Sequence, residues 1–180
     1  MSNKNEYIIS ADKLCSPLKK IFIPCISIIL IHFIIWNKSS FSDSILSDKG
    51  FLIIVLTCIL GIFLSIILHE GIHAIVFMFT TKCSFSCIKF GIKDGNPYCH
   101  CSEKMRVKHY TLSLLAPFII LGILPSIIGV YTNEISLTIF GIFNIISSAG
   151  DLCIRSLLKS CPKNSFIEDH PCEIGFYLYE

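Results

Sequence analysis

The stretch ILHEGIHAIVF, residues 67–77, decides the fold that we expect. His69, Glu70 and His73 are ionisable, yet they stand within an apolar segment that covers residues 51–80. A helix places positions i and i+4 on one face, so both imidazoles can reach one point beside it. Charged side chains inside an apolar span cost about 2.5–3.5 kcal/mol each on insertion scales and usually serve a function. We therefore expect a membrane helix that carries a polar site.

The composition of the whole chain also indicates a membrane protein. Of 180 residues, 53% are hydrophobic and 16% are charged, whereas soluble domains average about 25% charged residues. The mean hydropathy is +0.70. A membrane span needs about 20 apolar residues at 1.5 Å each, and the candidates are residues 21–36, 51–80, 110–131 and 135–158. The net charge of +2 gives no indication of nucleic acid, and we expect no such partner.

The first apolar stretch, residues 21–36, has two interpretations. It is short enough to be a signal peptide. The polar leader before it is long, however, and no small-residue cleavage site follows it. We favour a retained anchor, which gives four transmembrane helices.

The basic residues predict which side of the membrane each segment faces. Four spans place the N-terminal tail, the loop 82–108 and the C-terminal end of the chain on one side. That side carries thirteen of the fifteen Lys and Arg residues. By the positive-inside rule it is the cytoplasmic side, so we expect both termini in the cytoplasm.

The loop between the second and third spans has a β pattern. Apolar and polar residues alternate in places over residues 84–90, Asp94-Gly95 follows, and a second extended run covers residues 98–101. An Asp-Gly pair between such runs is typical of a β-hairpin. We expect one domain, residues 1–180, of the all-α membrane class, with about four transmembrane helices and a small cytosolic β-hairpin between the second and third. The segment 159–180 is expected to pack on the cytosolic face.

Four of the ten cysteines lie in the hairpin loop: Cys83, Cys87, Cys99 and Cys101. Such a group could bind a structural zinc ion. Its C-x-x-x-C and C-x-C spacings do not match the usual zinc-knuckle pairs, however. We favour reduced thiols, as expected in the cytosol.

The H-E-x-x-H pattern of residues 69–73 predicts a zinc site. Zinc binds imidazole nitrogen at about 2.0–2.1 Å, and a catalytic site leaves one position for water. Glu70 would stand beside that position and activate the zinc-bound water as a general base. The alternatives are a polar patch for helix packing, or the frayed cytosolic end of a long span.

Depth in the membrane selects Asp151 as the third ligand. His69 lies 18 residues into the second span, or ~27 Å from its outer end. Asp151 lies 16 residues into the fourth span, or ~24 Å from its outer end. Both are expected near the cytosolic edge. Asp151 could instead pair with Arg155, one turn further along the same helix. Other candidate ligands are His100, Glu103, His109, Asp169 and His170.

Asn144 lies seven positions before Asp151, which is two turns along the same helix face. Its amide could stabilise an oxyanion or hold a substrate backbone. An Asn in a span can equally bond a neighbouring helix. The sequence leaves both roles open.

The chain resembles a family of small bacterial membrane proteins identified as zincin peptidases of unassigned substrate. Several short motifs carry this resemblance in the same order over residues 60–180, which is more specific than HEGIH alone. That family is in turn similar to the site-2 protease class of intramembrane metalloproteases. The motifs are HEGIH at 69–73, PYCHC at 97–101, LLAPFIILGILP at 114–125, SAGDL at 148–152 and DHPCEIGFY at 169–177.

This resemblance implies that His69, His73 and Asp151 are zinc ligands and that Glu70 is the catalytic base. Asn144 would match the Asn of the site-2 protease class. That class usually has Asn-Pro and Leu-Asp-Gly, whereas this chain has Asn-Ile at 144–145 and Gly-Asp-Leu at 150–152. The resemblance also implies a peptide or transmembrane-protein substrate and a location in the bacterial inner membrane, in contact with the lipid bilayer.

Three functions are therefore compatible with the sequence. The leading one is zinc-dependent hydrolysis of a peptide bond, within or beside the membrane near its cytosolic face. The second is a non-catalytic membrane protein that binds a divalent metal as a carrier or sensor. A carrier needs a polar path, and the outer halves of these spans are apolar. The third is a structural membrane partner with a vestigial site.

Overall fold

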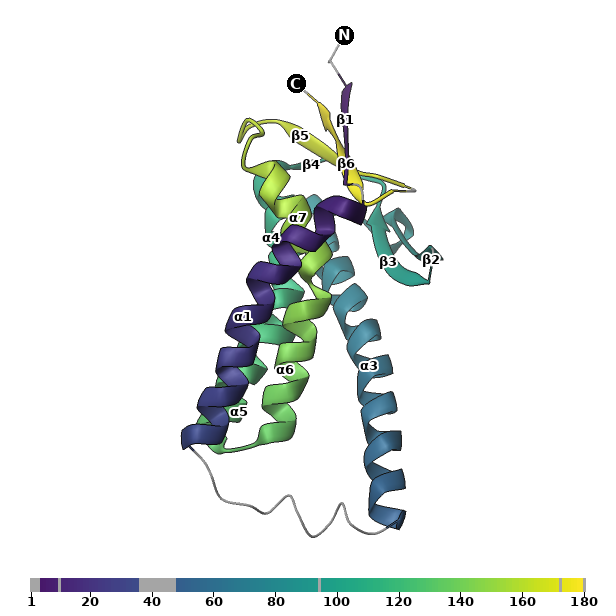
Figure 1. Cartoon of the computed structure of the whole chain (residues 1–180). Coiled ribbons are helices and arrows are strands. Elements are labelled where there is room, and N and C mark those ends of the chain that lie inside the picture. Colours follow the sequence, from purple (N-terminus) through teal and green to yellow (C-terminus); the bar gives the residue numbers. More distant parts are fainter. Residues whose placement is uncertain (1–3, 10, 36–47, 94, 172, 180) are drawn as a thin grey trace.

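A computed structural model describes residues 4–9, 11–35, 48–93, 95–171 and 173–179, and it shows a helical bundle with strands at one end (Figure 1). The helices are α1 (Ala11–Ile35), α3 (Asp48–Thr81), α4 (Val107–Pro117), α5 (Leu124–Thr132), α6 (Ile135–Ser147) and α7 (Ala149–Leu158). A π-helical segment, η2 (Phe118–Ile123), joins α4 to α5, and a short 3₁₀ turn, η1 (Phe85–Cys87), precedes the hairpin.

Two helical segments are long and apolar enough to cross a membrane. They are Ile59–Thr81 in α3 and Val107–Thr132, which covers α4, η2 and α5. Helices α6 and α7 form a third if this pair, bent by 46°, is one span. The apolar segment Lys20–His32 of α1 is shorter. By length and composition, the described residues therefore allow two or three spans, and the four-span arrangement stays a prediction.

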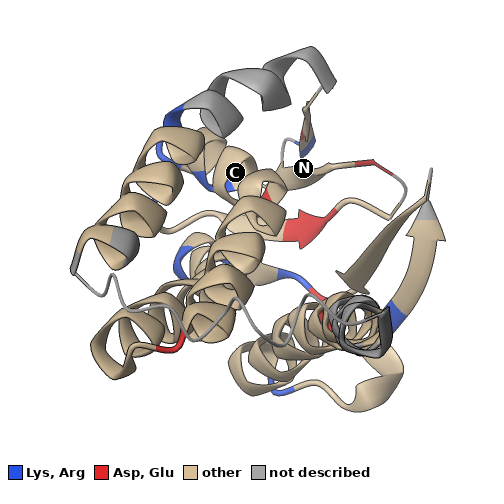
Figure 2. Ribbon diagram, turned by 60° about the horizontal axis from the view of Figure 1, so that its bottom comes forward, with Lys and Arg blue, Asp and Glu red and all other residues tan. Residues whose placement is uncertain are grey.

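Helix α3 has apolar side chains on all sides along much of its length. A helix that is apolar all round belongs in a core or a membrane. The described side chains of its first two thirds are mostly exposed, and they include Leu52, Leu56, Ile59, Leu60, Ile62, Phe63, Leu64 and Ile67. Charged residues lie mainly on strands, loops and helix ends rather than along the helices (Figure 2).

The α4–α5 segment and α6 are in close backbone contact. A Cβ atom at Gly141 would lie 2.3 Å from Ser126 Oγ and 2.6 Å from the Gly122 carbonyl oxygen, so only glycine fits there. The π-helical η2 begins directly after Pro117, which has no N–H to continue the regular ladder. This packing fixes α6, and α6 in turn determines where α7 begins.

Two β-sheets lie at one end of the bundle, where both termini are also found (Figure 1). The predicted hairpin is present as β2 (Ile88–Lys93) and β3 (Asn96–Cys101). Residue 94 of the predicted turn lies outside the described residues, while Gly95 has φ +81°, a conformation that favours glycine.

The second sheet was not predicted from the sequence. It is antiparallel and has the order β1-β6-β5-β4. It joins segments from both ends of the chain: β1 (Lys4–Ile8), β4 (Met105–Arg106), β5 (Phe166–Asp169) and β6 (Gly175–Tyr179). The expected all-α description therefore omitted a β layer. The segment after residue 158 indeed packs on the helix ends, as strands.

The main core lies between this sheet and the helix ends. Ile167, Phe176 and Leu178 of the sheet are almost fully buried, together with Phe77 of α3 and Tyr110 of α4. Burying a large apolar side chain contributes about 1.5–3 kcal/mol. This core therefore holds the ends of α3, α4 and α7 together, one turn beyond the H-E-x-x-H segment.

Candidate metal centre

The structure brings the side chains of His69, His73 and Asp151 together. The two histidines are one turn apart on α3 and are 9% and 6% exposed. Asp151 Oδ2 lies 3.1 Å from His69 Nε2 and 3.5 Å from His73 Nε2. Among the described residues, these three form the one group of His, Cys, Asp or Glu side chains compact enough to hold a metal ion. The convergence predicted from depth is thus present.

The spacing of these donor atoms suits zinc. Two ligands at 2.0–2.1 Å from a tetrahedral ion are about 3.3–3.4 Å apart. The observed separations of 3.1 and 3.5 Å lie on either side of that value. Two imidazole nitrogens and one carboxylate oxygen also leave a fourth position open, as catalytic zinc sites do.

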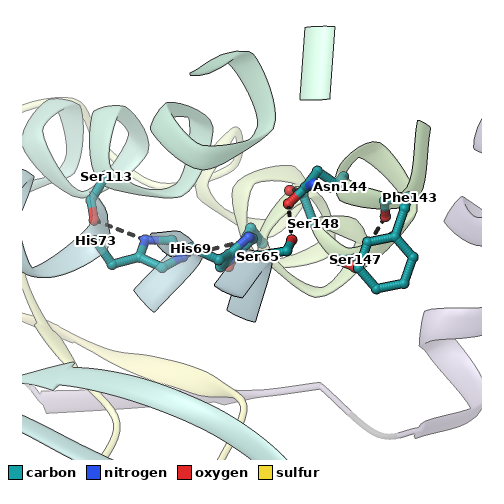
Figure 3. Close-up of polar contacts among 9 residues, drawn as sticks. Ser65, His69, His73, Ser113, Phe143, Asn144, Ser147 and Ser148 are labelled. Atoms are coloured by element: carbon teal, nitrogen blue, oxygen red, sulfur yellow. Dashed lines mark hydrogen bonds and ion pairs between the residues drawn. The ribbon is translucent and has the colours of Figure 1, made fainter. Parts of the chain in front are cut away.

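Ser113 of α4 contacts the ring nitrogen of His73 that faces away from Asp151. Its Oγ lies 3.3 Å from His73 Nδ1, and Ser113 is fully buried (Figure 3). If Nε2 binds a metal, Nδ1 carries the proton and donates it to the hydroxyl oxygen, which fixes the ring orientation. Nδ1 of His69 is buried and has no hydrogen-bond partner within the described part of the chain.

A break in the helix places Asp151. Helix α6 ends at Ser147, and α7 starts at Ala149 with a bend of 46°. Asp151 therefore lies in the first turn of α7, where the helix dipole favours a carboxylate. Its ion-pair partners in the described residues are the two histidines, and the alternative pairing with Arg155 is not formed.

Glu70 lines the same cavity as the three candidate ligands. This cavity has a volume of about 990 Å³ and extends between α3, α6, α7 and the edge of β3. The Glu70 side chain is half-buried, and its carboxylate accepts a hydrogen bond from the backbone N–H of Cys99. The hairpin thus contacts the candidate catalytic carboxylate directly, which the sequence did not indicate.

Asn144 connects α6 to α3. It is fully buried, and its Oδ1 accepts a 2.6 Å hydrogen bond from Ser65 Oγ (Figure 3). Its Nδ2 donates to the Phe140 carbonyl at 2.9 Å. The amide has a second N–H, and Asn144 lines the cavity. The interhelical bond matches the packing role, and the role toward substrate stays a prediction.

The other candidate ligands have different partners. Tyr110 donates a 2.6 Å hydrogen bond to Asp169, whose other oxygen lies 3.2 Å from His100 Nδ1. Glu103 accepts from Cys87 Sγ at 3.6 Å, and His170 pairs with Glu6 at 3.0 Å. Tyr110 and Asp169 line the cavity; a Tyr at the start of an apolar span is typical of an interfacial anchor, so no sequence pattern marks Tyr110 as part of the site.

The four cysteines of the hairpin region are free thiols. Burial raises the pKa of Cys101 to about 12 and also raises that of Cys99, so both are neutral at physiological pH. No described group of three metal-binding side chains includes them. The choice between reduced thiols and a structural zinc site stays a prediction.

The fold and the site together define the class of protein to which the chain belongs. This is an apolar helical protein with one compact His-His-Asp group and a glutamate beside it, all in one cavity. A family model described as "Putative zincin peptidase" matches residues 62–166, more than half of the chain. The chain belongs to this family, whose description indicates a zinc-dependent peptidase. No curated protein and no solved structure gives a significant match.

Proposed function

We propose that the protein is a zinc-dependent peptidase that acts within or beside the membrane, near the cytosolic face. The observation that supports this most strongly is the group of His69, His73 and Asp151 with Glu70 in the same cavity. The family description agrees with it. When bound, zinc would polarise the scissile carbonyl and acidify a water molecule.

The protein's own residues would transfer the protons and hold the reacting groups in position. Glu70 would accept a proton from the attacking water and pass it to the amine nitrogen of the leaving fragment. The Cys99 N–H holds one side of the Glu70 carboxylate, which limits its rotation. Ser113 would keep His73 in the tautomer that presents Nε2 to the metal.

Several observations support a membrane setting. The candidate ligands stand on α3 and α7, and the Ile59–Thr81 segment of α3 passes the length and hydropathy test for a span. The cavity that holds the candidate ligands is also lined by residues of β3, β5 and β6, so it lies toward the end of the bundle that carries the sheets (Figure 1). The positive-inside rule assigns that end to the cytoplasm. A peptide or a transmembrane segment reaching this level would be the substrate.

Glu70→Gln tests the mechanism. The purified chain, in detergent with zinc, would be incubated with a mixed peptide library, and cleavage would be followed by mass spectrometry. General-base catalysis typically contributes 10²–10⁴-fold, so we expect cleavage to fall by about that factor while zinc remains at one per chain. Glu134→Gln, an exposed glutamate before α6 at the far end of the bundle, is the matched control.

Equal cleavage by the parent and Glu70→Gln would contradict the proposal. The same variant separates a peptidase from the metal carrier. Zinc uptake into proteoliposomes that persists in Glu70→Gln, without peptide cleavage by the parent, would favour the carrier.

A further inference from the structure

A second hollow lies where α4 begins and α7 ends. It has a volume of about 510 Å³ and shares no lining residue with the metal cavity. We call it the basic pocket. Its lining residues are Arg106, Val107, Lys108, Leu158, Lys159, Cys161, Lys163 and Asn164.

Within the described residues, no carboxylate compensates the positive charge of the basic pocket. Four of its lining residues are basic and exposed, and none is acidic. In the described structure, none of the four forms an ion pair with a carboxylate. Lys104, close by in sequence, differs because its ammonium lies 3.6 Å from the centre of the Tyr179 ring. Four unpaired cations around one hollow favour an anionic ligand, and Asn164 adds amide donors.

The position of the pocket narrows the choice of anion. Arg106 and Lys108 flank the start of the apolar segment Val107–Thr132, and Lys159 directly follows the last residue of α7. The start of α4 and the end of α7 thus lie at one level, and their basic residues line the same pocket. In a membrane protein this is the level of the lipid headgroups.

The surface beneath the cations is apolar. Val107, Leu158 and Cys161 form a buried floor. Leu112 is four residues beyond Lys108, hence on the same helix face, and it is 53% exposed. A site whose cations border a buried apolar floor and an exposed leucine, Leu112, suits a lipid better than a free phosphate ion.

We propose that the basic pocket binds the phosphate-bearing headgroup of an anionic lipid in the cytoplasmic leaflet. This inference needs the membrane setting but not the peptidase activity. The two can therefore fail separately.

Native mass spectrometry of the full chain in detergent tests it. The chain would be titrated with dioleoyl phosphatidylglycerol, with dioleoyl phosphatidylcholine, and with inorganic phosphate alone. We expect phosphatidylglycerol to bind in preference to the other two. An exposed ion pair with the lipid phosphate is worth at most about fivefold in affinity, so Lys159→Gln with Lys163→Gln should weaken phosphatidylglycerol binding several-fold, by at most about 25-fold. Arg106→Gln with Lys108→Gln should have a similar effect.

The matched control is Lys82→Gln with Lys89→Gln. It removes the same charge from two exposed lysines that do not line the pocket, and it should leave lipid affinity within about twofold. Equal losses in the control would overturn the proposal, because the effect would then be one of net charge. Equal binding of the two lipids would also overturn it. Binding of inorganic phosphate as tight as that of phosphatidylglycerol would replace the lipid with a soluble anion.

Discussion

The hydrogen bond between Ser113 and His73 offers a sharp test of the metal site. Ser113 is fully buried, and its hydroxyl lies 3.3 Å from His73 Nδ1. Ser113→Ala removes the acceptor without adding volume. When Nε2 binds zinc, the proton must be on Nδ1, which then becomes a buried donor without a partner. The metal-free protein avoids this cost because the other tautomer is available to it.

The expected loss of zinc affinity follows from this difference between the zinc-bound and the metal-free protein. A buried donor that has lost its partner costs about 1–3 kcal/mol, and the loss of such a supporting group typically weakens metal binding 10–100-fold. The bond is slightly longer than the usual limit of about 3.2 Å, so we take the lower end of that range. We expect zinc affinity to fall about tenfold, which is about 1.4 kcal/mol.

The assay is a competition titration of zinc between the purified protein and a chromophoric chelator. Ser126→Ala is the control, because Ser126 is also a buried serine of the same helical segment and bonds the Gly122 carbonyl at 2.9 Å. The turnover of fully zinc-loaded Ser113→Ala should remain close to that of the parent, since Ser113 only positions a ligand. A zinc affinity equal to that of Ser126→Ala would refute the reasoning.

Three further predictions concern the third ligand, the helix packing and the hairpin. Asp151→Ala should reduce bound zinc well below one per chain, whereas Arg155→Gln should retain it; metal analysis showing full zinc in Asp151→Ala would remove Asp151 from the site. Gly141→Ala should destabilise the protein by about 1–3 kcal/mol through overpacking against Ser126, which lowers the melting temperature by about 2–12 °C. Gly61→Ala, with nothing within 4 Å of the added Cβ, should cause no such loss. Because the pKa of Cys101 is raised to about 12 from 9.0, the folded state keeps the thiol proton that the unfolded state loses; stability should therefore be intact below pH 9 and decline as pH rises toward 12. Cys101→Ala should make that decline shallower in thermal scans, and an unchanged slope would count against this linkage.

The apolar helices and the hairpin could be predicted because their signals are local. Run length and hydropathy predicted residues 51–80 and 110–131, and the structure has helices over Asp48–Thr81 and Val107–Thr132. The fourth stretch, 135–158, has the predicted limits but is broken at Ser148 into two helices. Hydropathy does not record such a break. The second sheet joins residues about 170 positions apart through short strands, which no local pattern reveals.

The sequence by itself determined that His69, Glu70 and His73 share one short stretch of helix, because a 3.6-residue period fixes the spacing i to i+4. It also indicated Asp151 as the third ligand, because counting residues along the two spans places Asp151 and His69 at a similar depth in the membrane. Only the tertiary structure decided that Asp151 lies 3.1 Å from His69, that Ser113 lies behind His73, and that a strand backbone contacts Glu70. These contacts join α3 to α4, α7 and β3. They depend on how the helices pack, on the 46° bend before Asp151 and on the sheet that holds the helix ends, none of which is encoded in neighbouring residues.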